Sequence, residues 1–124
     1  MPINTPIYLQ DNTGQAVAAK KFKEVFTLLD AVTTNQTSAA VAIPKGPRTI
    51  QSSIAGTGAV SATVTWYGSN INAASGGVVI DTHTLSGTTT ATEGSEITAE
   101  WPYIYCILTS IAGTGAAVTA TVGA

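Results

Sequence analysis

A histidine and an aspartate two positions apart are the first groups in this 124-residue chain that suggest chemistry. Asp81 precedes His83 by two residues, and side chains at that spacing on a β-strand point to the same face. A serine supplied from elsewhere in the chain would complete a hydrolase-like Ser-His-Asp set. However, no Gly-x-Ser-x-Gly sequence is present, and a lone histidine on a strand is more often a surface or half-buried residue than a base. We therefore expect no enzyme activity.

Other nucleophiles and metal ligands are few. Cys106 is the only cysteine, so an internal disulfide and a multi-cysteine metal site are excluded, and its apolar surroundings favour a small hydrophobic side chain. Glu93, Glu96 and Glu100 would share a helical face, but the Gly-Ser pair after Glu93 favours a loop and a solvated acidic edge, with weak Ca²⁺ binding as the alternative. The aspartate and histidine offer two metal ligands and no third. We expect no cofactor and no metal.

The aromatic residues concentrate at Trp66 and Tyr67 and again at Trp101 and Tyr103. A carbohydrate-binding site would need such rings to be exposed and coplanar, whereas anchoring of a core or an interface is the commoner use. The Asn35-Gln-Thr sequence matters as a glycosylation site only in a secreted protein. The N-terminus has neither the basic nor the apolar region of a secretory signal, so we expect the mature chain to begin near Met1.

Composition excludes several partners. Only 10% of residues are charged and the formal net charge is −2, so there is no basic surplus for nucleic-acid binding. The uncharged stretch from residue 101 to 124 is interrupted by Thr, Ser and Gly, and therefore fits a pair of strands better than a membrane-spanning helix. We expect a single domain that binds neither nucleic acid nor membrane.

The elements that position these groups are predicted to be strands. From Val25 onward, residues with strong β preference dominate, and Gly and Asn separate them at short intervals. The run 103–109 is the most apolar and is expected to be the central strand. Together with it, the predicted strands are 50–54, 60–66, 78–85 and 117–122.

One seven-residue block occurs twice: residues 53–59 and residues 110–116 both read Ser-Ile-Ala-Gly-Thr-Gly-Ala. Gly-Thr-Gly between strand-like runs supplies two positions that accept positive φ, which a tight hairpin connection requires. We therefore interpret both copies as hairpin turns, and Ser86-Gly87 as a further turn. The alternative is a chance repeat in Ala-, Gly- and Thr-rich sequence.

The chain divides into residues 1–24, expected to be an N-terminal arm or outlying hairpin, and residues 25–124, expected to be the main domain. The first part carries two prolines and a possible turn at residues 11–14. Every Lys and Arg lies at or before Arg48, whereas three glutamates crowd the second half. This separation allows identical subunits to meet with opposite charge, although scattered solvated charges are the alternative.

Over roughly its last hundred residues, the chain resembles small virion proteins of tailed bacteriophages, and within that group capsid decoration, or cementing, proteins. The resemblance rests on a series of strand and turn words: TLLDAV at 27–32, AVAIP at 40–44, RTIQ at 48–51, TVTWYGSN at 63–70, LSGT at 85–88, WPY at 101–103 and GTGAAVT at 113–119. The resemblance implies a single antiparallel β-sandwich or jelly-roll domain and carries no catalytic or capsid-contact motif.

The function implied by this resemblance is structural. Such a protein binds the outer surface of the capsid, is assembled in the host bacterial cytoplasm, and cements contacts between major capsid protein subunits as a homo-oligomer, expected to be a trimer. The alternative is a phage tail, fibre or host-recognition protein that binds a glycan.

We hypothesise that the N-terminal segment makes these capsid or inter-subunit contacts through edge strands or arms that add to another sheet. Ile7, Tyr8 and Leu9 would be its apolar anchors. Its basic residues, which would meet carboxylates of the partner, are Lys20, Lys21 and Lys23.

Overall fold

The computed structural model describes residues 10–13, 15–16 and 24–124, and these residues form strands and connections without a helix. Strands β1 (Gln10–Thr13) and β2 (Gln15–Ala16) pair antiparallel as a two-stranded sheet. The other six strands form a second sheet, in which every pairing is antiparallel. The all-β, antiparallel prediction is confirmed. No helix in the described part of the chain is long and apolar enough to cross a membrane.

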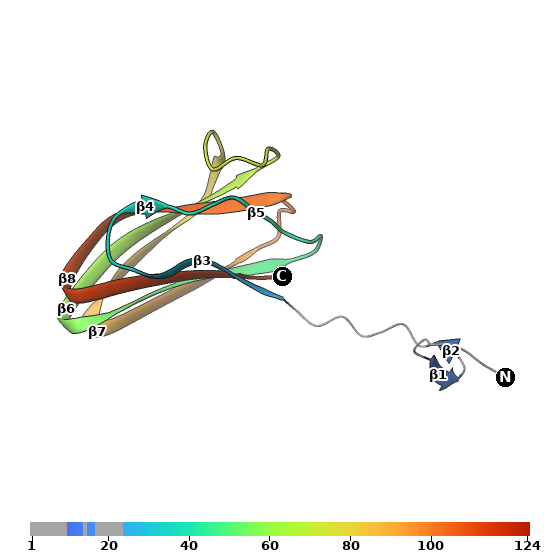
Figure 1. Ribbon diagram of the computed structural model, residues 1–124, viewed down its shortest axis with the longest axis horizontal. Helices are drawn as coiled ribbons and strands as arrows, with labels where there is room; N and C mark the ends of the chain where they lie inside the picture. Colours follow the sequence, from blue (N-terminus) through green and yellow to red (C-terminus); the bar gives the residue numbers. More distant parts are fainter. Residues whose placement is uncertain (1–9, 14, 17–23) are drawn as a thin grey trace.

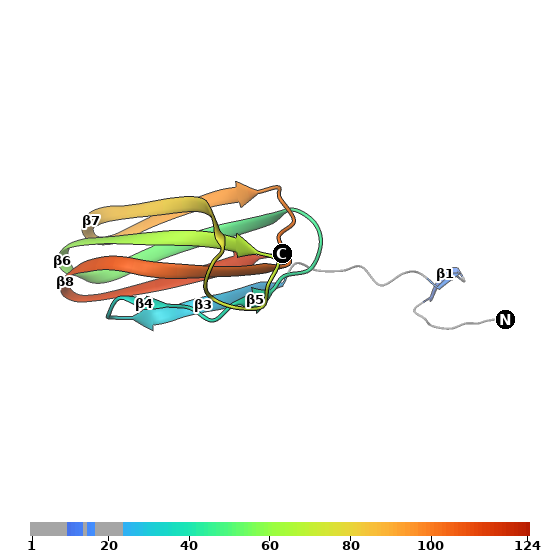
Figure 2. The same ribbon diagram turned by 90° about the horizontal axis from the view of Figure 1, so that it is seen from above.

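Three long strands dominate the second sheet. They are β6 (Arg48–Ser69), β7 (Val78–Ile97) and β8 (Tyr103–Gly123), and the shorter strands are β3 (Val25–Val32), β4 (Gln36–Thr37) and β5 (Val41–Ala42). The order across the sheet is β3-β8-β6-β7, and β4 and β5 also pair with β8 (Figure 2). Strand β8, which contains the run 103–109, is therefore an interior strand, as predicted.

Each long strand bends near its middle, so the sheet folds over and its two halves face each other (Figure 1). One layer holds the first limb of β6 and the last limbs of β7 and β8, with β3 at its edge. The other layer holds the remaining limbs, with β4 and β5 at its edge. A single continuous sheet therefore provides both layers. The separate sheets of a β-sandwich or jelly roll are not confirmed.

The two copies of the repeated block lie at this bend, inside β6 and β8, and pair with each other, with Thr57 opposite Thr114. The prediction of two hairpin turns at Gly-Thr-Gly is wrong, and so is the turn at Ser86-Gly87, which lies within β7. Glycine's tolerance of positive φ is used here to bend strands: φ is +79° at Gly58 and +65° at Gly115. The chain reverses instead at residues 70–77 and 98–102.

The bend on β7 uses a different residue. Thr89 has φ of +68°, which is unusual for a β-branched side chain, and it lies where residues 56–58 of β6 interrupt the register between the two strands. A second irregularity occurs on β3, where Ala31 has φ of +51° and its N–H donates to Thr119 Oγ1 at 3.1 Å. Each of these departures from regular pairing increases local curvature.

The core fills the space between the two layers. Along β6, alternate residues from Ile50 to Ile54 and from Val60 to Gly68 are buried, so the period-two pattern of a strand with one buried face holds on both limbs. Trp66, at 0% exposure, is the largest buried side chain. The other strands contribute Leu29, Leu85, Ile97, Ile104, Cys106, Leu108, Ala116, Val118, Ala120 and Val122.

The proposed boundary at residue 24 stays a prediction. The backbone of Glu24 exchanges two hydrogen bonds with Ala124, at 2.7 and 2.8 Å, and so continues the β3–β8 ladder. Farther toward the N-terminus, Gln10 lies opposite Ala16 in the small β1–β2 sheet.

Glycine substitutions at the bend test its geometry. A Cβ on Gly113, where φ is +124°, would meet the carbonyl oxygen of Ala59 at 2.7 Å, whereas a Cβ on Gly58 or Gly115 would meet nothing within 4 Å. We expect Gly58→Ala and Gly115→Ala each to cost about 1 kcal/mol of unfolding free energy through backbone strain. Gly113→Ala adds a backbone clash and should cost about 3 kcal/mol. Urea unfolding of the three variants measures this order, and equal losses would contradict it.

Candidate functional site

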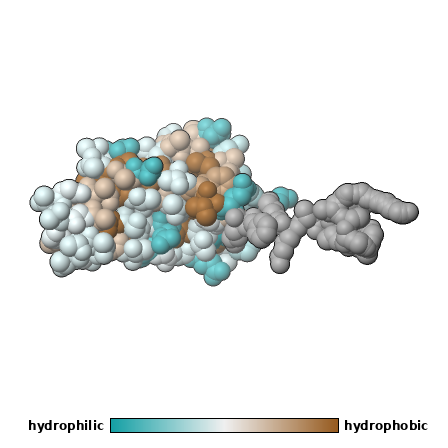
Figure 3. Space-filling view, turned by 60° about the horizontal axis from the view of Figure 1, so that its bottom comes forward, coloured by the Kyte–Doolittle hydropathy of each residue, from teal (hydrophilic) through white to brown (hydrophobic). Residues whose placement is uncertain are grey.

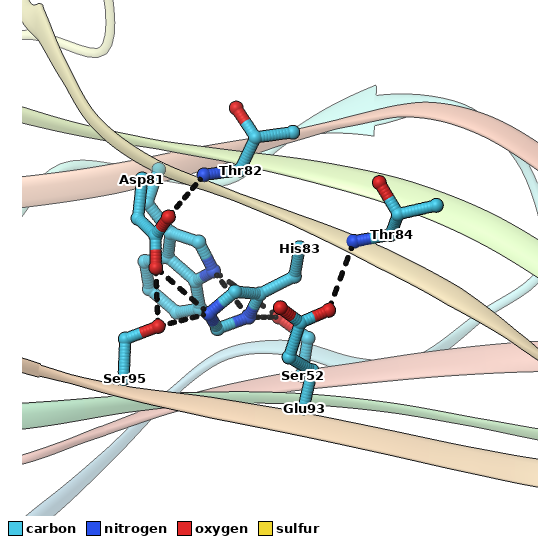
Figure 4. A network of polar contacts seen from close by, with 8 residues as sticks. Ser52, Asp81, Thr82, His83, Thr84, Glu93 and Ser95 are labelled. Carbon is cyan, nitrogen blue, oxygen red and sulfur yellow. Dashed lines mark hydrogen bonds and ion pairs between the residues drawn. The ribbon is translucent and has the colours of Figure 1, made fainter.

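The one histidine of the chain lies at the centre of a buried polar network. His83 is 0% exposed, and its ring contacts serines from two other stretches: Nδ1 is 2.8 Å from Ser52 Oγ, and Nε2 is 2.8 Å from Ser95 Oγ (Figure 4). Asp81, on the same face of β7 as predicted, places Oδ2 3.3 Å from Nε2. We call Ser52, Asp81, His83, Glu93 and Ser95 the polar clasp.

The hydrogen bonds of the clasp run in one direction. The indole N–H of Trp66 donates to Ser52 Oγ at 3.1 Å, and the Ser52 hydroxyl then donates to Nδ1 of His83. On the other side of the ring, Nε2–H donates to Ser95 Oγ, and the Ser95 hydroxyl donates to Asp81 Oδ2. Both ring nitrogens and both serine hydroxyls in this chain of bonds therefore have partners.

The clasp joins the two layers at the edge formed by β7. Asp81 and His83 lie on the first limb of that strand, and Glu93 and Ser95 lie on its second limb. Glu93 Oε1 also accepts the backbone N–H of Thr84 at 3.1 Å, across the gap between the limbs (Figure 4). The outer edge of an edge strand has backbone groups with no neighbouring strand to pair with. At β7, these side-chain hydrogen bonds connect the two layers along that edge, where no further strand of the described chain does so.

The residues Ser52, His83 and Asp81 have the composition of a hydrolase triad but not its accessibility. Ser52 is 0% exposed and its hydroxyl is held between Trp66 and His83, so no substrate carbonyl reaches it in this structure. Asp81 is bonded mainly by Ser95, and that hydrogen bond lowers the pKa of its carboxyl below the ordinary value of 3.8. The geometry is that of a closed structural network.

Cys106 is a buried free thiol on β8, and burial raises its pKa to about 12. A thiol with that pKa is almost fully protonated at neutral pH and is a poor nucleophile. Its backbone exchanges hydrogen bonds with Ser38, at 2.8 and 3.0 Å, next to the β4 edge. The position of Cys106 therefore fits the small hydrophobic role expected of it.

A buried cation that the sequence did not single out lies at the open end of the folded sheet. Arg48 is 1% exposed, and its guanidinium donates to the carbonyl oxygens of Pro44, Gly46 and Trp101. Burial lowers the pKa of Arg48, while the nearby Glu100 carboxylate raises it. The side chain thereby ties two loops to the first residue of β6. No local motif in the sequence marks this role.

The acidic residues are arranged differently from the prediction. Glu93 and Glu96 lie within β7, so the loop expected around them is wrong, and only Glu100 lies in the loop that follows. All three are exposed. In the part of the chain that the structure describes, no three His, Cys, Asp or Glu residues come together as a metal site would need.

The predicted aromatic sites separate into buried and exposed ones. Trp66 is fully buried, so it cannot present a ring to a sugar. Tyr67 stacks on Tyr105 with centroids 4.9 Å apart, and the hydroxyl of Tyr105 accepts the N–H of Gly77 at 2.9 Å. Trp101 is half-buried and borders a shallow depression at the open end.

The asparagine of the possible glycosylation sequence lies on the surface, whereas the predicted contact residues are not described. Asn35 is exposed, and its Nδ2 donates to the carbonyl oxygen of Thr109 at 2.9 Å. The predicted contact residues Ile7, Tyr8, Leu9, Lys20, Lys21 and Lys23 lie outside the described residues.

The fold and its closed polar centre define a small all-β protein built from one bent antiparallel sheet, with its histidine inside. No protein-family model matches the chain, and no curated protein matches it in sequence. Among solved structures, it is similar to the SPBc2 prophage-derived protein YomS, with a TM-score of 0.55 and 15% identity over 87% of this chain and 98% of that chain. The likeness shows a shared fold.

The contribution of the clasp to stability should depend on pH. Because folding lowers the pKa of Asp81, its stabilising effect is complete above about pH 4, the unfolded value, and is lost as the pH falls through the lower folded value. We expect Asp81→Asn to cost about 1 kcal/mol at pH 7 and progressively less below pH 4. Chemical unfolding across this range measures the difference, with Asp30→Asn, at an exposed position on β3, as the control. A pH-independent loss would contradict this account.

The burial of Cys106 predicts its reactivity. Iodoacetamide at pH 8 should label the native protein far more slowly than the urea-unfolded protein, because the folded thiol is both inaccessible and protonated. Mass spectrometry of timed samples measures the two rates. Equal rates would show that β8 is open near Cys106.

Proposed function

We propose that this protein is a structural component of a bacteriophage virion that binds the outer surface of the capsid and cements contacts between major capsid protein subunits. The observation that carries this proposal is the fold shared with a prophage-derived protein over nearly the whole length of both chains. In this proposal, the bent sheet takes the place of the β-sandwich or jelly-roll domain of such proteins.

The surface is suited to burial against other subunits. Most of the face seen in Figure 3 is neither strongly hydrophilic nor strongly hydrophobic, and its apolar areas are small and separate. Among the described residues, long charged side chains are few, and β7 exposes mainly threonines toward its bend. Short side chains lose little conformational entropy when an interface forms, which favours stable packing without strong charge pairing.

We propose a non-enzymatic role because each group with catalytic potential is committed elsewhere. The clasp engages Ser52 and His83 in a closed network, and Cys106 is a protonated, buried thiol. We further propose that the protein is a homo-oligomer, with a trimer as the expected state. Its place would be the outer shell of the virion, with no nucleic-acid or membrane partner.

The alternative is a tail, fibre or glycan-binding protein. One of the two tryptophans considered for glycan binding is buried. Trp66 lies in the core and cannot meet a sugar, whereas Trp101 is half-buried and borders a surface depression. The number of copies separates the two roles: a decoration protein should occur in purified particles at a level comparable with the major capsid protein, whereas a tail protein should occur at a small fraction of it. Absence from the particles would contradict both.

The N-terminal segment provides a direct test of capsid binding. Deletion of residues 1–19 removes the apolar triplet 7–9 but leaves β3 and the rest of the main sheet in place. We expect the shortened protein to retain its thermal unfolding midpoint and to lose most of its occupancy on capsids, because its anchoring contacts are gone. Binding to capsids that lack the protein, measured by sedimentation and gel densitometry, gives the occupancy. Undiminished binding would contradict the anchoring role.

A further inference from the structure

The outer side of β7 is the longest free edge of the main sheet. β7 has 20 residues and, among the described strands, it pairs only with β6. The edges at the other side of the sheet are shorter: β4 and β5 have two residues each, and β3 has eight, interrupted by the irregularity at Ala31. Because a free edge is a template for a further strand, β7 offers the greatest length for strand addition.

The sequence of β7 is one that pairs readily with copies of itself. Residues 82–92 contain no Asp, Glu, Lys, Arg or Pro, and six of these eleven residues are threonines. High β preference and low charge without proline are typical of segments that associate edge to edge. Asp81 and Glu93 lie immediately before and after this run. Natural sequences often place charged residues at the ends of such segments, where they oppose association.

Both flanking carboxylates hold backbone N–H groups of β7. Asp81 Oδ1 accepts the N–H of Thr82 at 2.8 Å, and Glu93 Oε1 accepts the N–H of Thr84 at 3.1 Å (Figure 4). Alternate residues of a strand direct their N–H groups to the same side, so these two belong to the row that points away from β6. We call Asp81 and Glu93 the edge caps. They occupy donors that an added strand would need.

The edge caps act on the regular part of the first limb of β7. The register with β6 shifts at Ile80, and the bend at Thr89 follows farther along. Such distortions hinder the addition of a strand. Between them, residues 81–88 pair with residues 59–66 of β6 without a break. The two capped N–H groups therefore lie on the stretch that is straight enough to receive a partner.

The charge of the edge caps opposes one partner in particular. The side chain of Asp81 is 34% exposed, and Glu93 is exposed. The Ser95 hydroxyl, and after it the Thr82 N–H, lowers the pKa of the Asp81 carboxyl against the opposing effect of burial, so this cap is ionised at neutral pH. A cationic strand would be attracted to such an edge. The identical edge of a second copy would bring like charges together, which opposes pairing.

We propose that the outer edge of β7 is a self-pairing surface that the edge caps keep closed. By holding the N–H groups of Thr82 and Thr84, Asp81 and Glu93 prevent this edge from pairing antiparallel with the same edge of a second copy. The inference goes beyond the proposed virion role and does not depend on it, since it concerns the purified protein. The proposed oligomer then forms through other surfaces.

Removal of the edge caps from the full-length chain tests the inference. We expect the double variant Asp81→Ala/Glu93→Ala to associate beyond the state of the unaltered protein at concentrations at least about tenfold lower, because its freed N–H groups pair with a second copy. Sedimentation velocity over a concentration series measures this change. Glu93→Gln keeps an oxygen acceptor for Thr84 and should associate less than Glu93→Ala.

Two control variants separate the caps from charge and from stability. Glu96→Ala removes another exposed carboxylate of β7, one that holds no backbone N–H group of that strand. Gly113→Ala lowers stability through the clash at the bend but leaves both caps in place. Each control should associate as the unaltered protein does. Circular dichroism and thermal unfolding establish that every variant is folded.

A lysine locates the association at the edge. Ser86 on β7 and Ser61 on β6 are both exposed and lie directly opposite each other. Lysine on an edge strand opposes strand addition, so Ser86→Lys should reverse the association of the double variant. Ser61→Lys, one strand farther from the edge, should reverse it less. Hydrogen exchange in the associated double variant should slow within residues 82–92 and stay unchanged in β3.

Four outcomes would overturn the proposal. The first is a double variant that associates no more than the unaltered protein. The second is an increase of the same size in Glu96→Ala or Gly113→Ala, and the third is equal association of Glu93→Gln and Glu93→Ala. The fourth is association that Ser86→Lys leaves intact or that both lysines reverse equally.

Discussion

The bend that β6, β7 and β8 share at one level is the constraint on which the rest of the structure depends. A flat sheet of strands this long would leave one apolar face in water, whereas bending all three strands at the same level places the two halves of that face against each other. The bend must occur in neighbouring strands together, because paired strands have to keep their hydrogen bonds on both sides of it. The pairing of the two Gly-Thr-Gly segments with each other, at Thr57 and Thr114, meets this requirement for the two interior strands.

Bending creates an open side at the edge strand β7, and the polar clasp is the response to it. Folding brings Glu93 and Ser95 opposite His83 and Thr84, although nine or more positions separate each bonded pair along the chain. A buried histidine is costly when either ring nitrogen lacks a partner, and here Ser52 and Ser95 satisfy both. Ser52, His83 and Asp81 are residue types found in hydrolase active sites. Here they help to hold the two layers together, and the burial of Ser52 and His83 separates them from substrate.

The sequence allowed the strand-forming runs and the antiparallel, all-β class to be predicted, because alternation of apolar and small polar residues is a local property. It also placed Asp81 and His83 on one face, since spacing along a single strand decides that. The prediction of hairpin turns at Gly-Thr-Gly fails because positive φ serves a hairpin turn and a strand bend equally well, and the choice depends on pairing between residues more than fifty positions apart. Ser52, Ser95 and Trp66 were not identified as partners of His83 for the same reason: only the folded sheet brings them together.

Continuity of the long strands has a consequence for how the domain folds and unfolds. Each limb of β6, β7 and β8 in one layer is covalently continuous with a limb in the other, and the short strands β3, β4 and β5 pair only with β8, so neither layer has a set of strands that could persist after the other separates. The domain should thus lose its structure in one cooperative step, without a stable half-folded intermediate. Its contact order is also high, since Thr49 lies opposite Gly123 and Glu24 bonds to Ala124, which places it among slowly folding β proteins. A subunit with these properties opens as a whole or not at all.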